Sequence, residues 1–394
     1  LAANLDSDPA LEVAITSSFG KVWIADRSGE TVALDPPAGY DYDRFLGSAA
    51  GDVTGDGRSD IVVAVQQKIA VPDQQRVSVL LFSRPSSTWT CREIAASGGN
   101  QELATPVAGT APVLLQADST PELEIALRTR GDDGGAPHLY LWRRNGQTDE
   151  WEAFSEDFPL QLQGGFFAPP TAADFDGDGR EEILVTNFAP DPPGTQILLL
   201  DIGDGGAVET VWRNLEELNT GGYTARAFGT LAAAMGDGVL YLAGAAKPQS
   251  FCSDYKKVFL CTVTPGDTAS IDLAWQTDWV TGKDFYGNMT GPSLGNVDSD
   301  SGLEVLYMLN GGGFDSEGVL TAWNIEDGTL AWEGPTVPFN PIASGGGADI
   351  KSQAATGMVS SGPGPSAVMT GFSTLCTGAD PQLADGTVPG FPAY

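Results

Sequence analysis

The sequence predicts an all-β fold built from repeated units of four short antiparallel strands. Three observations predict it: an acidic nine-residue frame that recurs along the chain, tryptophans spaced at nearly equal intervals, and alternating apolar and polar runs that flank turn residues. The 50 glycines and 26 prolines fit many short elements joined by tight turns. No helical periodicity survives the glycines, so the repeats predict a β-propeller.

The frame has a carboxylate or amide at positions 1, 3 and 5, a turn at positions 5 and 6, and an acid at position 9. A strand-like apolar run follows it. The first frame is NLDSDPALE (4–12), the second is DVTGDGRSD (52–60), the third, a worn copy, is QADSTPELE (116–124), the fourth is DFDGDGREE (174–182), and the fifth is NVDSDSGLE (296–304). The last interval is 122 residues, twice 61, which indicates a frame lost near 232–244. A further copy is due in 353–369, where the acids are missing, so we expect seven units.

The tryptophans give an independent measure of the repeat. Intervals of 62, 61, 63 and 57 residues separate Trp89, Trp151, Trp212, Trp275 and Trp332. Each lies late in its unit, which favours packing between units over a role as a sugar-binding platform. Between frame and tryptophan, two alternating runs surround Gly, Asn or Asp, as in HLYLWRRNGQTDEWEAF (138–154) and VLTAWNIEDGTLAW (319–332). This pattern is typical of a β-hairpin.

A strand before each frame and one after it complete four strands per unit. We therefore predict one seven-bladed β-propeller of four-stranded antiparallel blades over 1–394, with the frames between the first and second strands. The approximate units are 1–43, 44–104, 105–163, 164–222, 223–285, 286–342 and 343–394. A string of β-sandwiches would not repeat one loop in every unit. Because only three residues precede the first frame, we expect the inner strand of the first blade to be short or missing, either because the chain was cut from a longer one or because the ring closes imperfectly.

The charge balance excludes several partners. With 20 Lys and Arg against 52 Asp and Glu, the formal charge is −32, which has the wrong sign for nucleic acid or an anionic lipid surface. No apolar run approaches the roughly 20 residues of a membrane helix, so no membrane insertion is expected, and no signal peptide is visible at the start. We expect a monomer.

Histidine and cysteine content argues against several kinds of catalytic centre. The single histidine, His138, lies among strand-like residues and predicts a structural role. Zinc sites built on several histidines are excluded, and a Ser-His-Asp relay would depend on this one residue. The four cysteines have no CxxC spacing, and Cys252 and Cys261 are close enough to pair across a loop. We therefore expect a protein that is not an enzyme.

Oxygen atoms at alternate positions of a tight loop converge on one point, where a hard cation with six to eight oxygen ligands fits. The frame looks like the first half of an EF-hand loop, but its closing acid comes at position 9 and strands flank it. This spacing in propeller-length repeats resembles the FG-GAP repeat of integrin α-subunit propellers and their bacterial relatives. The segments FLGSAAGDVTGDG (45–57), FGT (228–230) and NFAP (187–190) echo its signature.

The resemblance implies calcium in four frames. Their side-chain ligands would be Asn4, Asp6, Asp8 and Glu12; Asp52, Thr54, Asp56 and Asp60; Asp174, Asp176, Asp178 and Glu182; and Asn296, Asp298, Asp300 and Glu304. The position-7 carbonyls would be those of Ala10, Arg58, Arg180 and Gly302. The third frame offers Gln116, Asp118, Thr120 and Glu124, with only two acids, and would be a weaker fifth site. An unliganded turn in which the side chains bond their own backbone is the alternative. Structural calcium implies an extracellular, cell-surface or periplasmic setting.

The resemblance also implies a binding or adhesion module that takes a protein or glycan ligand on the face opposite the calcium loops. The loops between second and third strands lie on that face, and one carries the tripeptide Arg130-Gly131-Asp132. The alternatives are a lectin-like propeller or the propeller domain of a polysaccharide-acting enzyme. A polysaccharide lyase would need a basic residue such as Lys283 or Arg226, and no motif singles either out.

Overall fold

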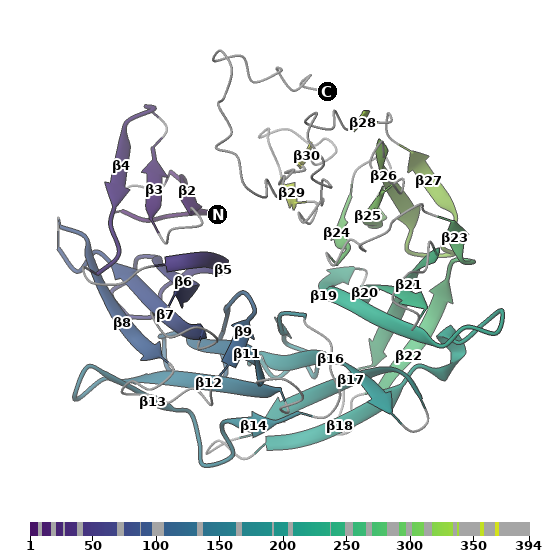
Figure 1. The fold of residues 1–394 in the computed structure, drawn as a ribbon, viewed down its shortest axis with the longest axis horizontal. Coiled ribbons are helices and arrows are strands. Elements are labelled where there is room, and N and C mark those ends of the chain that lie inside the picture. The colour runs from purple at the N-terminus through teal and green to yellow at the C-terminus, as the bar shows by residue number, and fades with distance from the viewer. Residues whose placement is uncertain are drawn as a thin grey trace. The chain divides into compact units, whose positions relative to one another are not determined.

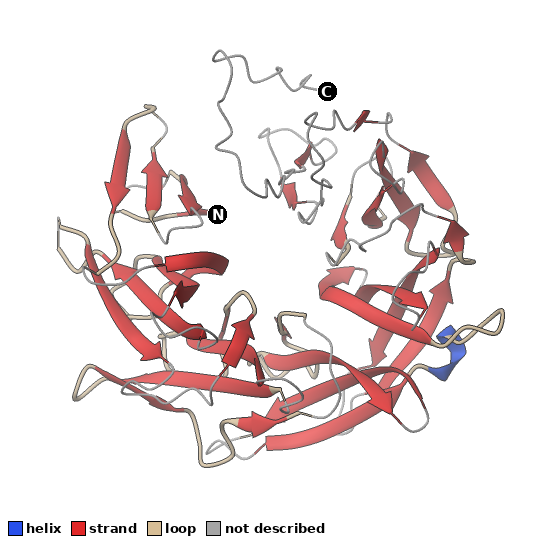
Figure 2. Cartoon of the chain, in the orientation of Figure 1, coloured by secondary structure: helices blue, strands red, loops and turns tan. Residues whose placement is uncertain are grey.

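The structure is a computed structural model of the 394-residue chain. It describes residues 1–6, 10–16, 21–26, 28–37, 42–68, 75–86, 88–96, 106–131, 137–162, 168–190, 193–203, 208–236, 238–248, 255–264, 270–281, 291–296, 302–310, 317–333, 337–338, 355–357 and 367–369. In these ranges the chain is almost entirely β-strand, with one short 3₁₀ helix, η1 (Glu216–Leu218), as Figure 2 shows. Among the described residues, no helix has the length and apolar character needed to span a membrane.

The chain divides into two compact units. The first contains Leu1–Asn214 with Pro265–Ala269, and the second contains Leu215–Thr264 with Ser270–Tyr394. The prediction of one seven-bladed ring over the whole chain is not tested by this division and stays a prediction.

Four antiparallel sheets make up the first unit (Figure 1). Sheet 1 contains β1 (Ala2–Ala3), β2 (Glu12–Thr16), β3 (Val22–Ala25) and β4 (Thr31–Leu34), and sheet 2 contains β5 (Tyr42–Gly51), β6 (Asp60–Lys68), β7 (Gln75–Ser83) and β8 (Thr90–Ala96). Sheet 3 contains β10 (Val113–Leu115), β11 (Glu124–Gly131), β12 (His138–Asn145) and β13 (Glu150–Ala153), with β9 (Pro106–Gly109) beside β11 and β14 (Leu160–Gln161) beside β12. Sheet 4 contains β15 (Thr171–Ala173), β16 (Glu182–Pro190), β17 (Pro193–Ile202) and β18 (Val208–Asn214).

The second unit contains two further sheets of the same order and one hairpin. Sheet 5 contains β19 (Ala225–Gly236), β20 (Val239–Pro248), β21 (Tyr255–Thr264) and β22 (Ser270–Gln276), with β23 (Val280–Thr281) beside β21. Sheet 6 contains β24 (Ser293–Gly295), β25 (Glu304–Asn310), β26 (Glu317–Asn324) and β27 (Leu330–Glu333), with β28 (Val337–Pro338) beside β26. The hairpin pairs β29 (Ala355–Gly357) with β30 (Ala367–Met369).

Within each unit, the first strands of successive sheets are neighbours. In the first unit β1 lies beside β5, β5 beside β10, and β10 beside β15; in the second, β19 lies beside β24 and β24 beside β29. Glycine permits this approach: a Cβ on Gly47 of β5 would lie 2.2 Å from the Ala111 side chain of the next sheet. Four-stranded sheets that succeed one another with adjacent first strands form a β-propeller-like, all-β fold.

Apolar side chains fill the space between successive sheets of the first unit. Along β6 the side chains alternate: Ile61, Val63 and Val65 face the cluster shared with sheet 1, whereas Val62 and Ala64 face the cluster shared with sheet 3. A third cluster joins sheets 3 and 4. In sheets 2, 3 and 4 the middle strands are buried on both faces, so their sequences are continuous apolar runs, as expected after each frame. Sheet 1 differs, because Val13 and Ile15 of β2 are 48% and 58% exposed.

Three sequence expectations can be compared directly with these strands. The inner strand of the first sheet, β1, has two residues, which confirms that it is short. Where a frame was judged lost, β19 and β20 form a tight hairpin in which Gly236 pairs with Val239. In 343–394 only the β29–β30 hairpin is described, so most of the seventh expected unit lies outside the described residues.

Candidate metal centre

Each of the five frames connects the first and second strands of its sheet, as the sequence predicted. The connections are β1–β2, β5–β6, β10–β11, β15–β16 and β24–β25. In every case the closing acid is the first residue of the second strand, and the five closing acids are Glu12, Asp60, Glu124, Glu182 and Glu304. All five are buried, with exposed fractions of 1–4%. The frames therefore recur at one structural position, at the start of the second strand.

The closing acid holds its frame by accepting a backbone hydrogen bond from position 2. The amides of Leu5, Val53, Ala117 and Phe175 donate to the closing carboxylates of their own frames at 2.7, 3.1, 2.7 and 2.6 Å. The side chains at position 2 are themselves buried, with at most 1% exposed. Sequence analysis missed this second anchor, although an apolar residue at position 2 of every frame was a visible signal.

The second and fourth frames share a turn built by position 1 and two glycines. The Asp52 carboxylate accepts the amides of Gly55 and Gly57, both at 2.7 Å, and the equivalent Asp174 carboxylate accepts the two matching amides of the fourth frame at 2.7 and 3.0 Å. Gly55 and Gly57 have φ of 72° and 82°, the left-handed region that favours glycine. This turn carries the backbone around the point on which the frame oxygens converge.

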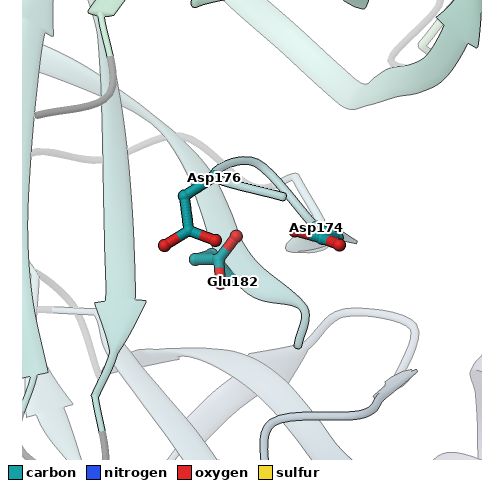
Figure 3. Close-up of side chains that lie close together, drawn as sticks. All are labelled: Asp174, Asp176 and Glu182. Carbon is teal, nitrogen blue, oxygen red and sulfur yellow. The ribbon is translucent and has the colours of Figure 1, made fainter. Parts of the chain in front are cut away.

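The fourth frame brings three carboxylates together. The side chains of Asp174, Asp176 and Glu182 lie close together (Figure 3). Each offers a carboxylate oxygen, and these atoms all lie within 4.8 Å of one another. Asp178, expected as a fourth ligand, instead pairs with Arg180, and this hydrogen bond holds the pKa of Asp178 below its ordinary value. The structure therefore groups the carboxylates at positions 1, 3 and 9 of the frame. The carboxylate at position 5, Asp178, points instead toward the side chain at position 7, Arg180.

Asp201 adds a further acid, from another strand, to the surroundings of the fourth frame. It follows Leu200, which pairs with Ile183, so it lies on β17 across from the first residue of β16. Burial, followed by the charges of Asp176 and Glu209, raises the pKa of Asp201. Sequence reasoning missed this residue because only the pairing of β16 with β17 places it beside the frame.

The remaining frames differ in how they are completed. In the second, the Thr54 hydroxyl donates to Asp60 at 3.0 Å. In the third, the Gln116 side-chain amide donates to the carbonyl of Asp118 at 2.8 Å and also to that of Thr120. In the first, Asp8 lies outside the described residues, and in the fifth, Asp298 and Asp300 do.

Two features of the oxygen atoms in the described frames suit a hard cation. The grouped ligand atoms of the fourth frame are all carboxylate oxygens, which suit Ca²⁺. In the first frame, the side-chain oxygen of Asn4 is buried without a hydrogen-bond partner among the described residues. A buried carbonyl oxygen without a donor is costly, and a cation would satisfy it.

The other residues singled out from the sequence do not join these frames. His138 begins β12, and its ring lies 6.3 Å from that of Tyr140; its structural role stays a prediction. Trp151 is buried between sheets 2 and 3, and the Trp275 indole donates to the Ile325 carbonyl at 2.8 Å, so both pack between sheets. Burial lowers the pKa of Arg226 on β19. Lys283, Asp132 and Cys252 lie outside the described residues, so the Cys252–Cys261 pairing stays a prediction.

Comparisons with known proteins give structural similarities alone. No protein-family model matches the chain, and no curated protein matches it. Similar solved structures include a thermostable family-43 glycoside hydrolase (15% identity, TM-score 0.39, 75% of this chain and 95% of that one) and a polysaccharide lyase (10%, 0.45, 93% and 88%). A third is an α-L-arabinanase from Penicillium chrysogenum in complex with arabinobiose (12%, 0.37, 85% and 78%).

The expectation that the chain is not an enzyme was wrong as argued. All three of these structures are carbohydrate-active enzymes, none of them an adhesion module. The physical reason lies in the premise, which treated a single histidine as evidence against catalysis. Glycoside hydrolysis needs only a pair of carboxylic side chains, which this acidic chain has in abundance.

Proposed function

We propose that this chain is a calcium-stabilised β-propeller whose function is directed at carbohydrate. The observation that supports the calcium part is the grouping of Asp174, Asp176 and Glu182 in a loop that joins two strands. Without a cation these carboxylates repel one another, and a bound ion removes that repulsion. The ion would hold the first strand of a sheet to the second. Asp52, Thr54 and Asp60 would hold a second ion in the same way.

Calorimetry and metal counting test the calcium part. We expect more than one ion per chain and a melting temperature that falls when a chelator is added, since a ligand that binds the folded state stabilises it by about 2.7 kcal/mol per site at a hundredfold excess over Kd. Asp176→Asn should remove one ion. Asp118→Asn, the matched change in the third frame, should leave the ion count unchanged. A melting temperature that ignores the chelator would contradict the proposal.

An aromatic pair in the segments that flank sheet 5 supports a carbohydrate ligand. Tyr223 is 39% exposed, and its ring meets that of the half-buried Trp279 edge to face, with centroids 6.0 Å apart. Lys257 lies 4.7 Å from the centre of the Trp279 ring, and the indole donates to the Thr220 carbonyl at 3.0 Å. Aromatic faces with polar groups at their edge suit sugar rings, which have apolar faces and hydroxyl rims.

The position of this pair agrees with the expected ligand face. Lys257 is near the start of β21 and Gln276 ends β22, so the pair lies at the end of sheet 5 away from the β19–β20 turn. That turn occupies the place of a frame. Of the tripeptide named for the adhesion hypothesis, Arg130 and Gly131 end β11 and pair with β9, and Asp132 lies outside the described residues.

Binding to insoluble and soluble polysaccharides tests this part, together with assays for released reducing ends or unsaturated sugars. Trp279→Ala and Tyr223→Ala should each weaken retention at least tenfold. Trp332→Ala, which removes another exposed indole, serves as the control. Equal retention of all three variants would exclude this surface, and release of products by the wild-type chain would identify an enzyme.

A further inference from the structure

Backbone hydrogen bonds join the second, third and fourth frames each to the frame before it. The amide at position 8 donates to the carbonyl at position 1 of the preceding frame: Ser59 to Asn4 at 3.0 Å, Leu123 to Asp52 at 2.9 Å, and Glu181 to Gln116 at 2.8 Å. Position 8 directly precedes the closing acid, and position 1 carries the first expected ligand. Each bond therefore connects the closing end of one frame with the opening of another.

The third frame is held together by hydrogen bonds among its own residues. The side-chain amide nitrogen of Gln116 donates to two carbonyl oxygens of the loop, much as a cation would bind several oxygen atoms. Arg143 follows Trp142, which pairs with Ile125, so it lies across from the closing acid Glu124 and brings a positive charge to it. In the fourth frame, the residue in the place of Arg143 is Asp201, an acid. The third frame thus has a basic side chain across from its closing acid, Arg143, which also pairs with Glu152 at 3.1 Å, whereas the fourth frame has an acid at that place.

The link between the third and fourth frames is doubled. Besides the bond from the Glu181 backbone amide to the Gln116 carbonyl, the Glu181 carboxylate accepts the backbone amide of Gln116 at 2.8 Å. The two bonds fix Gln116 to a residue adjacent to the closing acid Glu182. A hydrogen bond to a charged carboxylate is among the stronger hydrogen bonds, so Gln116 and Glu181 should move together.

We propose that the third frame is an ion-independent link through which cations in the second and fourth frames stabilise each other, with Glu181 as its positioning residue. The inference rests on the calcium binding proposed above. An ion in the fourth frame fixes Glu182 and with it Glu181, which holds Gln116. The third frame then presents Leu123 to the Asp52 carbonyl of the second frame. By linkage, the stabilisation acts equally in the reverse direction.

Hydrogen exchange of the Gly57 backbone amide, measured on the full chain at subsaturating calcium, reports on the stability of the second frame alone. This amide donates to the Asp52 carboxylate and to no group of the fourth frame. Asp176→Asn, which disables the fourth frame about 120 residues away, should lower Gly57 protection at least fivefold, the lower range of allosteric coupling. Glu181→Ala should do the same with all ligands intact. Glu181→Gln, which keeps an acceptor oxygen, should restore protection.

Glu150→Ala removes the same charge from an exposed position of sheet 3 and should leave Gly57 protection unchanged. Independent frames would overturn the inference: calcium would then bind in the expected number, yet neither Asp176→Asn nor Glu181→Ala would alter Gly57. Should Glu181→Ala fail to fold, the isosteric Asp176→Asn decides alone. If the wild-type chain binds no calcium, both this inference and the calcium proposal fail, whereas intact binding without coupling removes this inference only.

Discussion

At the scale of single residues, the closing acid combines two roles. It is buried at the start of a strand, where it accepts the position-2 amide, and it is also the expected last ligand of a cation. Burial raises the pKa of Asp60 and of Glu182 to about 7 and that of Glu124 to about 8. Without a cation, these positions therefore favour the protonated carboxyl, which costs less to bury than a carboxylate.

The sign of the resulting pH dependence follows from proton counting. An unfolded chain ionises these acids near pH 4, so between about pH 4 and 8 the calcium-free folded state holds more protons than the unfolded state. We expect the free energy of unfolding of the chelated protein to fall as the pH rises through this window. Denaturant unfolding at pH 5, 6, 7 and 8 measures it.

Asp60→Asn isolates one acid, because the amide oxygen can still accept from Val53. In this variant, the free energy of unfolding of the chelated protein should fall less steeply as the pH rises. Asp26→Asn serves as control, since Asp26 is exposed and hydrogen bonds, first from the Ser28 hydroxyl, lower its pKa. Stability that rises from pH 5 to 8 in the chelated protein would contradict the argument.

At the scale of elements, each frame is a turn that fixes how two strands begin. Glycine at positions 4 and 6 is required in the second and fourth frames because the backbone there has positive φ. A side chain at Gly57 would meet nothing within 4 Å, whereas a Cβ on Gly55 would lie 2.7 Å from the Glu122 carboxylate of the third frame. The two glycines therefore differ in packing while sharing a conformation.

Gly57→Ala should lower the free energy of unfolding by about 1 kcal/mol, the cost of a left-handed alanine. Gly55→Ala should cost more, because the third frame must also give way. In the double variant Gly55→Ala/Glu122→Ala, the additional loss of unfolding free energy relative to Gly57→Ala should disappear. Chemical denaturation of the four proteins measures these differences, and equal costs for the two glycines would show that the second and third frames are not in contact there.

At the scale of the whole molecule, the formal charge of −32 opposes compaction. Part of that charge is concentrated in the frames, where acids face one another across a loop. Cations relieve the repulsion there, and general screening by salt relieves the remainder.

We therefore expect sodium chloride between about 0.05 and 1 M to raise the melting temperature more in the chelated protein than in the calcium-loaded one. Bound calcium has already neutralised the frames, so less repulsion remains to be screened. Differential scanning calorimetry at fixed pH tests this, and an equal rise in both states would place the dominant repulsion outside the frames.

The sequence by itself determined the repeat, the four-stranded antiparallel sheets and the place of the frames between first and second strands. These features depend on local spacing, because alternation, turn residues and the nine-residue pattern are written along the chain. It also indicated that the third frame departs from the others, since Thr120 replaces the acid at position 5 and Gln116 stands where the other frames have Asp or Asn.

Only the tertiary structure decided which distant residues meet. It placed Asp201 and Arg143 across from closing acids, tied Glu181 to Gln116, and buried Arg128 fully, with its guanidinium donating to Thr186 and Asn187 of the next sheet. None of these contacts follows from local spacing, because each joins residues brought together by strand pairing or by the packing of one sheet on another. The physical reason is that a sequence pattern fixes what a residue can do, whereas the neighbours that let it do so are set by how the sheets stack.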